Sequence, residues 1–245
     1  MGKPHREYIH GLNPAFEVLR AGRRQVTQAY LNAATAESAR LRALRTQLER
    51  RAVPIELVDK GRLTQLAESH EHQGAVLRCS TYPYVAFEDL LGAPKLLLLD
   101  NVEDPHNVGA ILRSAEIFGF EAVALAMKGV PDVYPSVVKV SAGATEFLRL
   151  CKDRAANYYA RAALAAGYDV VALDGGGAVP LAAVAERLQG PLMLVIGGEN
   201  QAVGQWILNN AQHVVHIAQQ GRINSLNASV AAGIAMYALA GYQPH

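Results

Sequence analysis

Short apolar runs alternate with helical patterns from Lys95 onward, and they restrict the fold more than any other feature of the sequence. Each run lacks polar alternation and is followed by a stretch with the 3.6-residue spacing of an amphipathic helix. Such runs are typical of strands buried on both faces, as in a parallel sheet covered by helices. The sequence therefore predicts an α/β fold built from βαβ units. The expected strands are Leu96–Leu99, Ala122–Met127, Val170–Leu173, Leu192–Ile196 and Val214–Ile217, and the expected helices are Val108–Phe118, Ser136–Ala144, Ala155–Ala166, Leu181–Leu188, Val203–Asn210 and Ser225–Ala240.

The first third of the chain predicts a separate, smaller α/β unit. Its pattern breaks between Ser80 and Pro94, a stretch that contains Tyr82-Pro83-Tyr84 and a Gly-Ala-Pro sequence. We therefore expect residues 1–79 to form one domain, residues 80–94 a linker and residues 95–245 a second domain. In the first domain the expected helices are Asn13–Ala21, Ala36–Arg51 and Lys60–Ser69, and the expected strands are Val26–Ala33, Ile55–Val58 and Gly74–Cys79.

Basic residues are concentrated in that first third. Residues 1–78 contain 13 Lys and Arg against 8 Asp and Glu, whereas residues 79–245 contain 10 against 14. Clustered arginines bind nucleic-acid phosphates, because each contact releases counterions. They are equally typical of a solvated helix face. The candidate phosphate contacts are Arg23, Arg24, Arg40, Arg42 and Arg45.

Composition argues against a membrane protein and against a disulfide framework. No stretch reaches the roughly 18 apolar residues of a membrane span, and the segment from Met1 to Glu7 lacks the apolar region of a secretory signal. A cytoplasmic protein without a membrane partner is the resulting expectation. Cys79 and Cys151 lie in separate segments without CxxC spacing, so two free thiols are expected rather than a disulfide or a zinc site.

The loops that follow the apolar runs are the expected place for a ligand site, because open α/β sheets bind ligands at the carboxyl ends of their strands. The loop after the first run, from Asp100 to Gly109, contains neither GxGxxG nor a GKS/T phosphate loop. Gly175-Gly176-Gly177 has no following Lys or second glycine pair, and we interpret it as a flexible turn. A dinucleotide-dependent oxidoreductase is therefore disfavoured.

Three of these loops carry polar residues suited to binding or catalysis. In the first, Asn107 is a good helix cap, and Arg113 follows on the second turn of the helix, where it can reach a phosphate or a carboxylate. In the second, Glu199 follows a glycine pair and would face the same cleft. The third, Arg222–Asn227, is polar chain between two apolar elements, as in a binding loop. Taken singly, each loop is also explained by turn, cap or surface chemistry.

Together the three loops resemble the three motifs of the SpoU/TrmH-type family of knotted (SPOUT) RNA methyltransferases, in the same order and at similar separations. Leu99–Gly119 resembles the first motif, Leu194–Gly204 the second and His216–Tyr237 the third. The region Gly11–Cys79, with His72-Gln73-Gly74, is similar to the small α/β, ribosomal protein L30e-like RNA-binding domain of the family's ribosomal members. The resemblance implies a C-terminal parallel-sheet domain with a deep trefoil knot, an exception to the rule that chains avoid knots.

The resemblance also implies S-adenosylmethionine as the methyl donor and a homodimer formed in part by the helix after Ser225. Main chain at the second and third motifs would bind this cofactor. The corresponding residues are Gly197, Gly198, Ile217 and Leu226. By matching position, the catalytic set is Asn107, Arg113, Glu199, Ser225 and Asn227.

The five catalytic candidates are expected to act largely by positioning, because the ribose hydroxyl must be aligned with the methyl group while it loses its proton. Arg113 is the family's candidate for activating that hydroxyl together with a substrate phosphate. A guanidinium stays protonated in proteins, so we expect it to clamp the phosphate rather than act directly as the base. Asn107 and Asn227 would orient the ribose, and Glu199 would hold Arg113 or Asn107; no metal is required.

The group most similar in domain content methylates a guanosine ribose in the peptidyl-transferase region of 23S ribosomal RNA, which is the expected target. Alternatives are a tRNA, an rRNA site linked to antibiotic resistance, or a non-catalytic role in RNA binding and ribosome assembly. The chain departs from the common family pattern at Ala202, at Ala218-Gln219 and at Arg222-Ile223-Asn224. These departures line the cofactor loop and bear on cofactor affinity and target choice.

Overall fold

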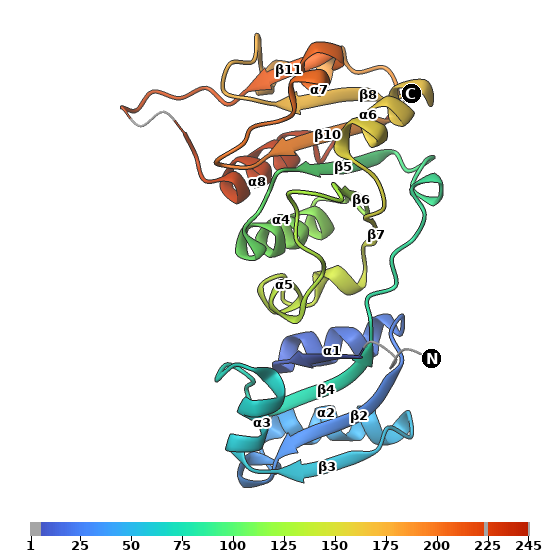
Figure 1. Ribbon diagram of the computed structural model, residues 1–245, viewed down its shortest axis with the longest axis vertical. Helices are drawn as coiled ribbons and strands as arrows, with labels where there is room; N and C mark the ends of the chain where they lie inside the picture. Colours follow the sequence, from blue (N-terminus) through green and yellow to red (C-terminus); the bar gives the residue numbers. More distant parts are fainter. Residues whose placement is uncertain (1–5, 223–224, 245) are drawn as a thin grey trace. The chain divides into compact units, whose positions relative to one another are not determined.

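The computed structural model describes residues 6–222 and 225–244, which form two compact units (Figure 1). The first unit contains the chain up to Pro83 together with Val133–Phe147, and the second contains Tyr84–Asp132 and the chain from Leu148 onward. Ile223 and Asn224, two of the residues that depart from the family pattern, lie outside the described residues.

The second unit is built on a seven-stranded sheet in the order β7-β6-β5-β10-β8-β11-β9, with every pair of neighbours parallel. Strand β5 is buried along its whole length because both faces of the sheet are covered. Parallel alignment places the carboxyl ends of the strands at one edge. The strands are β5 (Lys95–Asp100), β6 (Ala122–Leu125), β7 (Arg149–Cys151), β8 (Asp169–Leu173), β9 (Val179–Pro180), β10 (Leu192–Gly197) and β11 (His213–His216).

Helices cover both faces of this sheet. The chain passes from β5 outward to β6 through α4 (Pro105–Ile117), and from β7 back across the sheet to β8 through α6 (Ala156–Ala165). Right-handed crossovers in these opposite directions place the two helices on opposite faces. The C-terminal helix α8 (Ala228–Leu239) packs against α4 (Figure 1), and the short helix α7 (Gln205–Asn210) follows β10.

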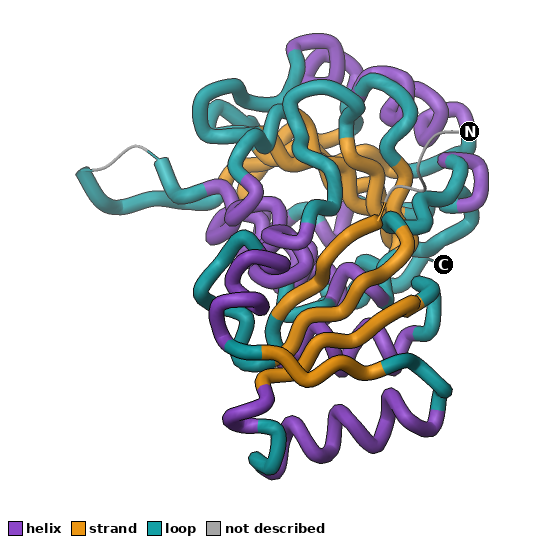
Figure 2. Tube along the Cα trace, turned by 60° about the horizontal axis from the view of Figure 1, so that its bottom comes forward, coloured by secondary structure: helices purple, strands orange, loops and turns teal. Residues whose placement is uncertain are grey.

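The first unit contains a four-stranded sheet in the order β1-β4-β2-β3, in which β2 and β3 run parallel and the other pairs antiparallel (Figure 2). Side chains alternate across β2, so Tyr30 packs with Leu63 and Val76 on one face while buried Leu31 points to the other. Helices are therefore needed on both faces. The strands are β1 (Arg6–His10), β2 (Val26–Asn32), β3 (Ile55–Val58) and β4 (Ala75–Ser80), and the helices are α1 (Leu12–Ala21), α2 (Ala39–Arg50) and α3 (Lys60–Ala67).

The first unit also includes α5 (Pro135–Val140) and a 3-10 turn at Ala144–Glu146, which pack against β1 and α1. Glu146 is buried, and its Oε2 lies 3.0 Å from Nε of Arg24. Arg24 also pairs with Glu7. Removing one member of a buried ion pair costs about 3–5 kcal/mol, because the other charge is left without a partner. Replacing Arg24 alone would therefore destabilise this unit.

Most of the helices and strands expected from the sequence are present, and the differences have local causes. The expectations omitted β1, β7 and β9, of which the last two are too short to show a pattern. The helix expected at Leu181–Leu188 is wrong, because this segment forms two 3-10 turns, Leu181–Ala183 and Ala185–Arg187. Oδ2 of Asp169 accepts hydrogen bonds from the N–H groups of the two residues that follow Leu188, at 2.6 and 2.8 Å, and fixes the chain there.

The stretch expected to be a linker, residues 80–94, is divided between the two units at Pro83. Its second part packs into the second unit: the ring of Phe87, in the 3-10 turn Phe87–Asp89, lies 4.8 Å from that of Tyr159, and Leu90 is fully buried. The segment Val133–Phe147 groups with the first unit although it lies between β6 and β7 in the sequence.

Both cysteines are free and buried, as expected from their spacing. Burial raises the pKa of the Cys79 and Cys151 thiols to about 12, so both stay protonated and unreactive near neutral pH. Among the described residues, no helix has the length and apolar character needed to cross a bilayer.

Candidate active site

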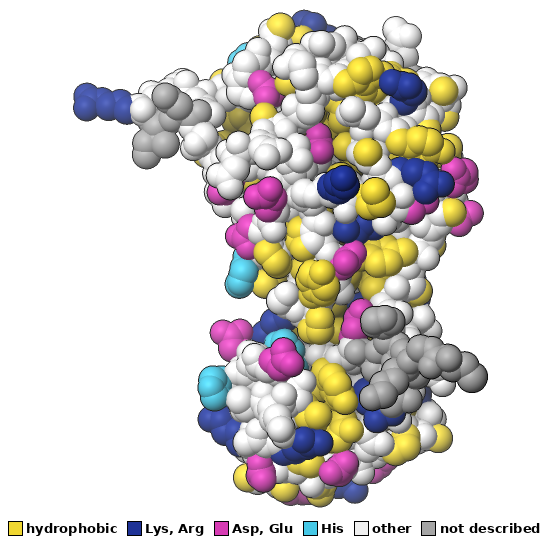
Figure 3. Space-filling view, in the orientation of Figure 1, with side chains coloured by type: hydrophobic (Ala, Val, Ile, Leu, Met, Phe, Trp, Pro, Cys, Tyr) yellow, Lys and Arg dark blue, Asp and Glu magenta, His cyan; other side chains and the backbone are white. Residues whose placement is uncertain are grey.

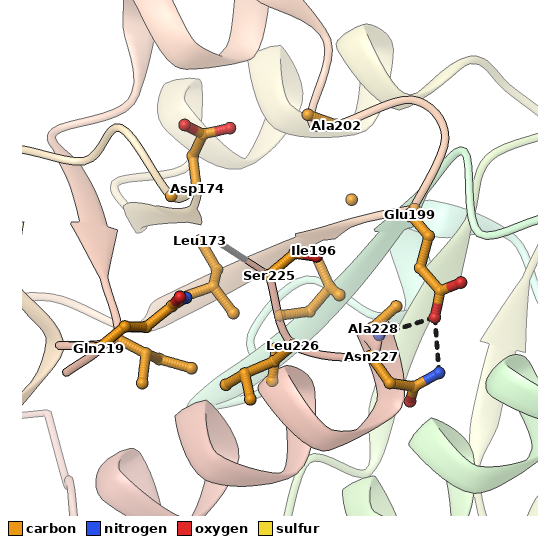
Figure 4. A pocket seen from close by; sticks show the side chains of 15 residues that line it. Leu173, Asp174, Ile196, Glu199, Ala202, Gln219, Ser225, Leu226, Asn227 and Ala228 are labelled. Carbon is orange, nitrogen blue, oxygen red and sulfur yellow. Dashed lines mark hydrogen bonds between the residues drawn. The ribbon is translucent and has the colours of Figure 1, made fainter. Parts of the chain in front are cut away.

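A cavity of about 660 Å³ opens where the carboxyl ends of β8, β10 and β11 approach the amino end of α8 (Figure 4). Small-molecule sites commonly measure about 300–1,000 Å³. All four residues expected to bind the cofactor line this cavity, and so do three of the expected catalytic residues. They are Gly197, Gly198, Ile217 and Leu226 in the first group, and Glu199, Ser225 and Asn227 in the second.

Glu199 joins two asparagines that come from distant parts of the chain. Its Oε1 accepts hydrogen bonds from Nδ2 of Asn227 at 2.5 Å, from the N–H of Ala228 at 3.2 Å and from Nδ2 of Asn107 at 3.3 Å. Nδ2 of Asn227 also donates to Oδ1 of Asn107 at 3.0 Å. The carboxylate lies at the amino end of α8, where the helix dipole favours a negative charge. Asn107, Glu199 and Asn227 are named here the Asn–Glu–Asn network.

The end of helix α8 determines how Asn227 is oriented. Its Oδ1 caps the helix by accepting hydrogen bonds from the N–H groups of Ser229 and Val230, at 3.0 and 3.3 Å. Because the oxygen faces the helix, Nδ2 points toward Glu199 and donates to it. One side chain thus fixes both the start of the helix and the geometry of the network.

Asn107 does not cap its helix, contrary to expectation. Asp104 caps α4 instead, since its Oδ1 accepts the N–H of His106 at 2.9 Å. Asn107 therefore lies in the first turn of α4, and its amide is free to reach Glu199. From the sequence, Glu199 was expected to hold either Arg113 or Asn107. In the structure it contacts Asn107.

Arg113 and Ser225 lie outside the Asn–Glu–Asn network. Arg113 is exposed on α4 and makes no hydrogen bond or ion pair with any residue that the structure describes. Ser225 lines the cavity and, within the same described part of the chain, makes no hydrogen bond to the network. Arg113 thus has a guanidinium available for an external anion.

Glycines at the end of β10 allow two loops to pack closely. A Cβ on Gly198 would lie 1.9 Å from the backbone oxygen of Asn101, and one on Gly197 would lie 2.4 Å from the backbone nitrogen of Val203. Asn101 itself adopts a positive φ of 57° and donates from Nδ2 to the oxygen of Ala202 at 3.3 Å. These glycines admit neighbouring backbone, which shapes the cavity wall, and both also line the cavity.

Asp100, the last residue of β5, anchors the loop that carries Glu199. Its Oδ2 accepts the N–H of Gly204 at 2.9 Å, and the residue is 6% exposed. Burial raises the pKa of Asp100, and the hydrogen bond from Gly204 opposes that shift. The loops after β5 and β10 therefore pack backbone against backbone at Gly198 and are also joined by side-chain hydrogen bonds.

Part of the cavity wall is formed by residues that were not expected there from the sequence. Asp174 and Gly175, which follow β8 directly, line it together with Gln219. Gly175 and Gly176 form a turn, as expected, but Gly177 packs tightly, because a Cβ there would lie 2.5 Å from the backbone carbon of Val215. The rule that ligands bind at the carboxyl ends of parallel strands was the signal that could have found Asp174.

The five arginines expected to contact RNA divide into two groups. Arg24 is 4% exposed and pairs with Glu146 and Glu7, so the structure contradicts its assignment as a phosphate contact. Arg23 donates to the hydroxyl of Tyr82 and to the oxygens of Pro83 and Glu146, which also gives it a structural role. The remaining three, Arg40, Arg42 and Arg45, are exposed on α2.

The surface of the first unit mixes both signs of charge. On the face seen in Figure 3, basic and acidic side chains are interspersed rather than gathered in one patch. On α2, Arg40 donates to Oδ1 of Asn13 at 2.6 Å, and Arg45 pairs with Glu49 at 2.8 Å. Such exposed contacts are weakened by solvent and can be exchanged for a phosphate. Among the described residues, no group of three or more His, Cys, Asp or Glu side chains is placed to hold a metal ion.

Comparisons with known proteins match both parts of the chain. The SpoU rRNA Methylase family model matches residues 94–237, and the model for RNA 2′-O ribose methyltransferase substrate binding matches residues 8–85. An uncharacterized tRNA/rRNA methyltransferase of Mycolicibacterium gilvum is 33% identical over 243 residues, which covers 96% of this chain and 76% of the relative.

Solved structures share the fold at low sequence identity. The AdoMet-bound rRNA methyltransferase from Sinorhizobium meliloti superposes with a TM-score of 0.79 at 22% identity, covering 95% of this chain and 86% of that one. The SpoU methyltransferase AviRb from Streptomyces viridochromogenes, in complex with AdoMet, superposes with a TM-score of 0.78 at 22% identity, covering 95% and 88%. These matches confirm the fold class expected from the resemblance.

Proposed function

This chain belongs to the SpoU rRNA methylase family, and we propose that it transfers a methyl group from S-adenosylmethionine (AdoMet) to a ribose 2′-hydroxyl of RNA. The substrate-binding match over residues 8–85 supports RNA as the substrate class. As the specific target we propose a guanosine ribose of 23S ribosomal RNA, from the resemblance to the group with that activity.

The observation that carries this proposal is the cavity beside the Asn–Glu–Asn network. Aliphatic side chains of Ile196, Ile217 and Leu226 in its wall suit the faces of a purine, and polar groups of Glu199 and Asp174 suit a ligand with cationic groups and hydroxyls. AdoMet has these parts, and its sulfonium supplies an electrophilic methyl group. The residues present therefore fit this cofactor.

The chain's own residues would position the ribose and its phosphate. Asn107 and Asn227 retain hydrogen-bonding capacity toward a hydroxyl, while Glu199 fixes both amides in place. Arg113, with no partner among the described residues, would bind a phosphate next to the reacting ribose through its two-pronged guanidinium. Alignment of two reactants is worth large rate factors, so a site built from fixed amides is consistent with this chemistry.

A map of 2′-O-methyl groups tests the function. Ribosomal and transfer RNA from cells with and without the gene would be compared nucleotide by nucleotide. We expect one ribose of 23S rRNA to lose its methyl group in the deletion and to regain it with purified protein and AdoMet. Loss of a tRNA methyl group would replace the rRNA target by a tRNA. No lost methyl group and no AdoMet binding by calorimetry would favour a non-catalytic assembly factor.

We propose Arg40, Arg42 and Arg45 of α2 as RNA contacts, in place of the original set of five. Neutralising all three to Gln is expected to weaken RNA binding in a filter or anisotropy assay. It should also reduce the slope of log affinity against log salt by roughly 0.7–0.9 for each phosphate contact removed. Arg62→Gln, an exposed change on α3 in the same unit, is the matched control. An unchanged slope in the triple variant would place the RNA surface elsewhere.

We also propose a homodimer that forms through α8. Val230, Ile234 and Tyr237 recur at helical spacing along α8 and are 39–72% exposed. An apolar stripe of this kind on a helix at the edge of the cavity fits the same helix of a second copy, related by a twofold axis. Light scattering should give a dimer for the wild type and a monomer after Val230→Lys with Tyr237→Lys. A monomeric wild type would contradict this arrangement.

A further inference from the structure

Asp174 stands in the cavity wall but takes no part in the Asn–Glu–Asn network. It directly follows β8, which lies between β10 and β11 in the sheet. It reaches the cavity from a different strand than Glu199 does, and Figure 4 shows the two carboxylates on different sides of the pocket, with Leu173, Ile196 and Ser225 drawn between them.

The backbone around Asp174 holds this residue firmly. Its N–H donates to the oxygen of Val215 at 2.9 Å, and its carbonyl oxygen accepts the N–H of Gly177 at 3.0 Å. One side-chain oxygen, Oδ1, accepts the N–H of Gly176 at 2.8 Å. The carboxylate is therefore fixed in orientation before any ligand arrives.

The other oxygen of that carboxylate is available. Oδ2 of Asp174 makes no hydrogen bond or ion pair with the residues that the structure describes, and the residue is only partly buried. Glu199 also has one oxygen without a partner among the described residues, but its Oε1 accepts three hydrogen bonds that tie the side chain to the Asn–Glu–Asn network, whereas Asp174 lies outside that network. An ionised carboxylate accepts about four hydrogen bonds in all, so Asp174 retains several sites for donors on a ligand.

We propose that Asp174 binds the ribose of the cofactor by accepting hydrogen bonds from its vicinal hydroxyls; this inference rests on the proposed use of AdoMet. Ile217 and Leu173 line the cavity next to Asp174 and suit the face of the base. Apart from the amino group and ring nitrogens of the base itself, the ribose hydroxyls are the polar groups of the cofactor attached nearest to the base, whereas the amino-acid group lies beyond the sulfur. An acid at the end of a parallel strand recognises ribose hydroxyls in dinucleotide-binding sheets by the same chemistry.

Calorimetry with three ligands tests the assignment without any measurement of activity. The ligands are S-adenosylhomocysteine, 5′-methylthioadenosine, which lacks the amino-acid group, and 5′-methylthio-2′-deoxyadenosine, which also lacks one hydroxyl. The wild type should prefer 5′-methylthioadenosine over its deoxy analogue by about tenfold or more, the usual effect of a hydrogen bond to a charged group. Asp174→Ala should bind the first two ligands about ten- to a hundredfold more weakly, and it should no longer distinguish the last two.

Two controls separate this contact from structural and long-range effects. Asp174→Asn keeps an acceptor for the N–H of Gly176, so the turn is retained, and it should show a smaller loss than Asp174→Ala. Glu186→Gln removes one exposed negative charge of the same unit at a residue outside the cavity wall, and it should bind all three ligands as the wild type does.

Several results would overturn the assignment. Unchanged affinities in Asp174→Ala would exclude the contact, and an equal loss for both methylthio ligands, with the preference retained, would show that Asp174 does not bind the ribose hydroxyls. A loss confined to S-adenosylhomocysteine would move the contact to the amino group of the amino-acid part. If the wild type bound none of the ligands, the proposed cofactor itself would be wrong. If the wild type bound them and Asp174→Ala bound them equally well, only the assignment of Asp174 would be wrong.

Discussion

Arg113→Ala is expected to lower kcat/KM for RNA methylation by about a hundredfold or more, the scale of effect that follows when a reacting group loses its alignment. The side chain is exposed on α4 and makes no hydrogen bond or ion pair with any described residue, so the fold does not depend on it. Exposed substitutions of this kind usually change stability by no more than about 0.5 kcal/mol. The melting temperature and the AdoMet affinity should therefore stay near those of the wild type.

Steady-state kinetics on the same variant distinguish the two roles left open for Arg113. A phosphate clamp that acts equally in the ground state and the transition state would raise KM for RNA, whereas an effect confined to the reaction would lower kcat. Arg113→Lys retains the charge but not the two-pronged geometry, so partial activity supports the clamp. Arg187→Ala, an exposed arginine of the same unit, is the control. Wild-type kinetics in Arg113→Ala would remove this residue from the mechanism.

Asn227→Asp is expected to cut methylation by roughly ten- to a hundredfold at neutral pH, in the range of positioning and proton-transfer effects. The new carboxylate can still accept the N–H groups of Ser229 and Val230, so the α8 cap is retained. It can no longer donate to Oε1 of Glu199, which lies 2.5 Å from the amide nitrogen of Asn227. Two carboxylates at this separation repel each other, and one then binds a proton more tightly.

The pH profile of Asn227→Asp provides its test. Repulsion raises the pKa of the carboxylate pair, and the proton taken up restores a donor between the two residues. Activity should therefore recover in part as the pH falls, relative to a wild type measured in parallel. A profile parallel to that of the wild type would contradict this account of the network.

A second substitution should rescue the first. Glu199→Gln combined with Asn227→Asp reverses donor and acceptor, because the glutamine amide can donate to the new carboxylate. The double variant should therefore be more active and more stable than Asn227→Asp alone. Asn227→Ala serves as the reference for complete loss, and it should also destabilise the protein by about 1 kcal/mol through loss of the helix cap. Failure of the double variant to recover would show that the charge of Glu199 itself is needed.

Several parts of the site could be predicted from the sequence because they depend on nearby residues. Apolar runs and their spacing located β5, β6, β8, β10 and β11, and the resemblance of the three loops to the family motifs named Asn107, Glu199 and Asn227 in advance. Their hydrogen bonds were not. Asn107 is 92 residues from Glu199 in the chain and 120 from Asn227, so no local pattern links them.

Packing also reversed some interpretations that were reasonable locally. Arg24 was expected on the RNA surface because it belongs to a basic pair, yet it is buried against Glu146, 122 residues away. Gly175-Gly176-Gly177 forms the turn that its composition predicts, but composition did not show that Gly177 packs against β11 or that Gly175 lines the cavity. Composition indicates which backbone conformations a segment can adopt, whereas its neighbours in the fold determine which of them it does adopt.

The sequence by itself determined the fold class, the buried strands, the helices near the motifs and the residue types that carry the chemistry, because these depend on periodicity and on side chains within a few positions. The tertiary structure decided the order of the strands, and with it the packing of the loop after β10 against Asn101 and Asp100. It also decided which amides share Oε1 of Glu199 and which carboxylate of the cavity wall lies outside the Asn–Glu–Asn network. These outcomes require the whole chain to pack at once, since each joins segments that are brought together only when the sheet has formed.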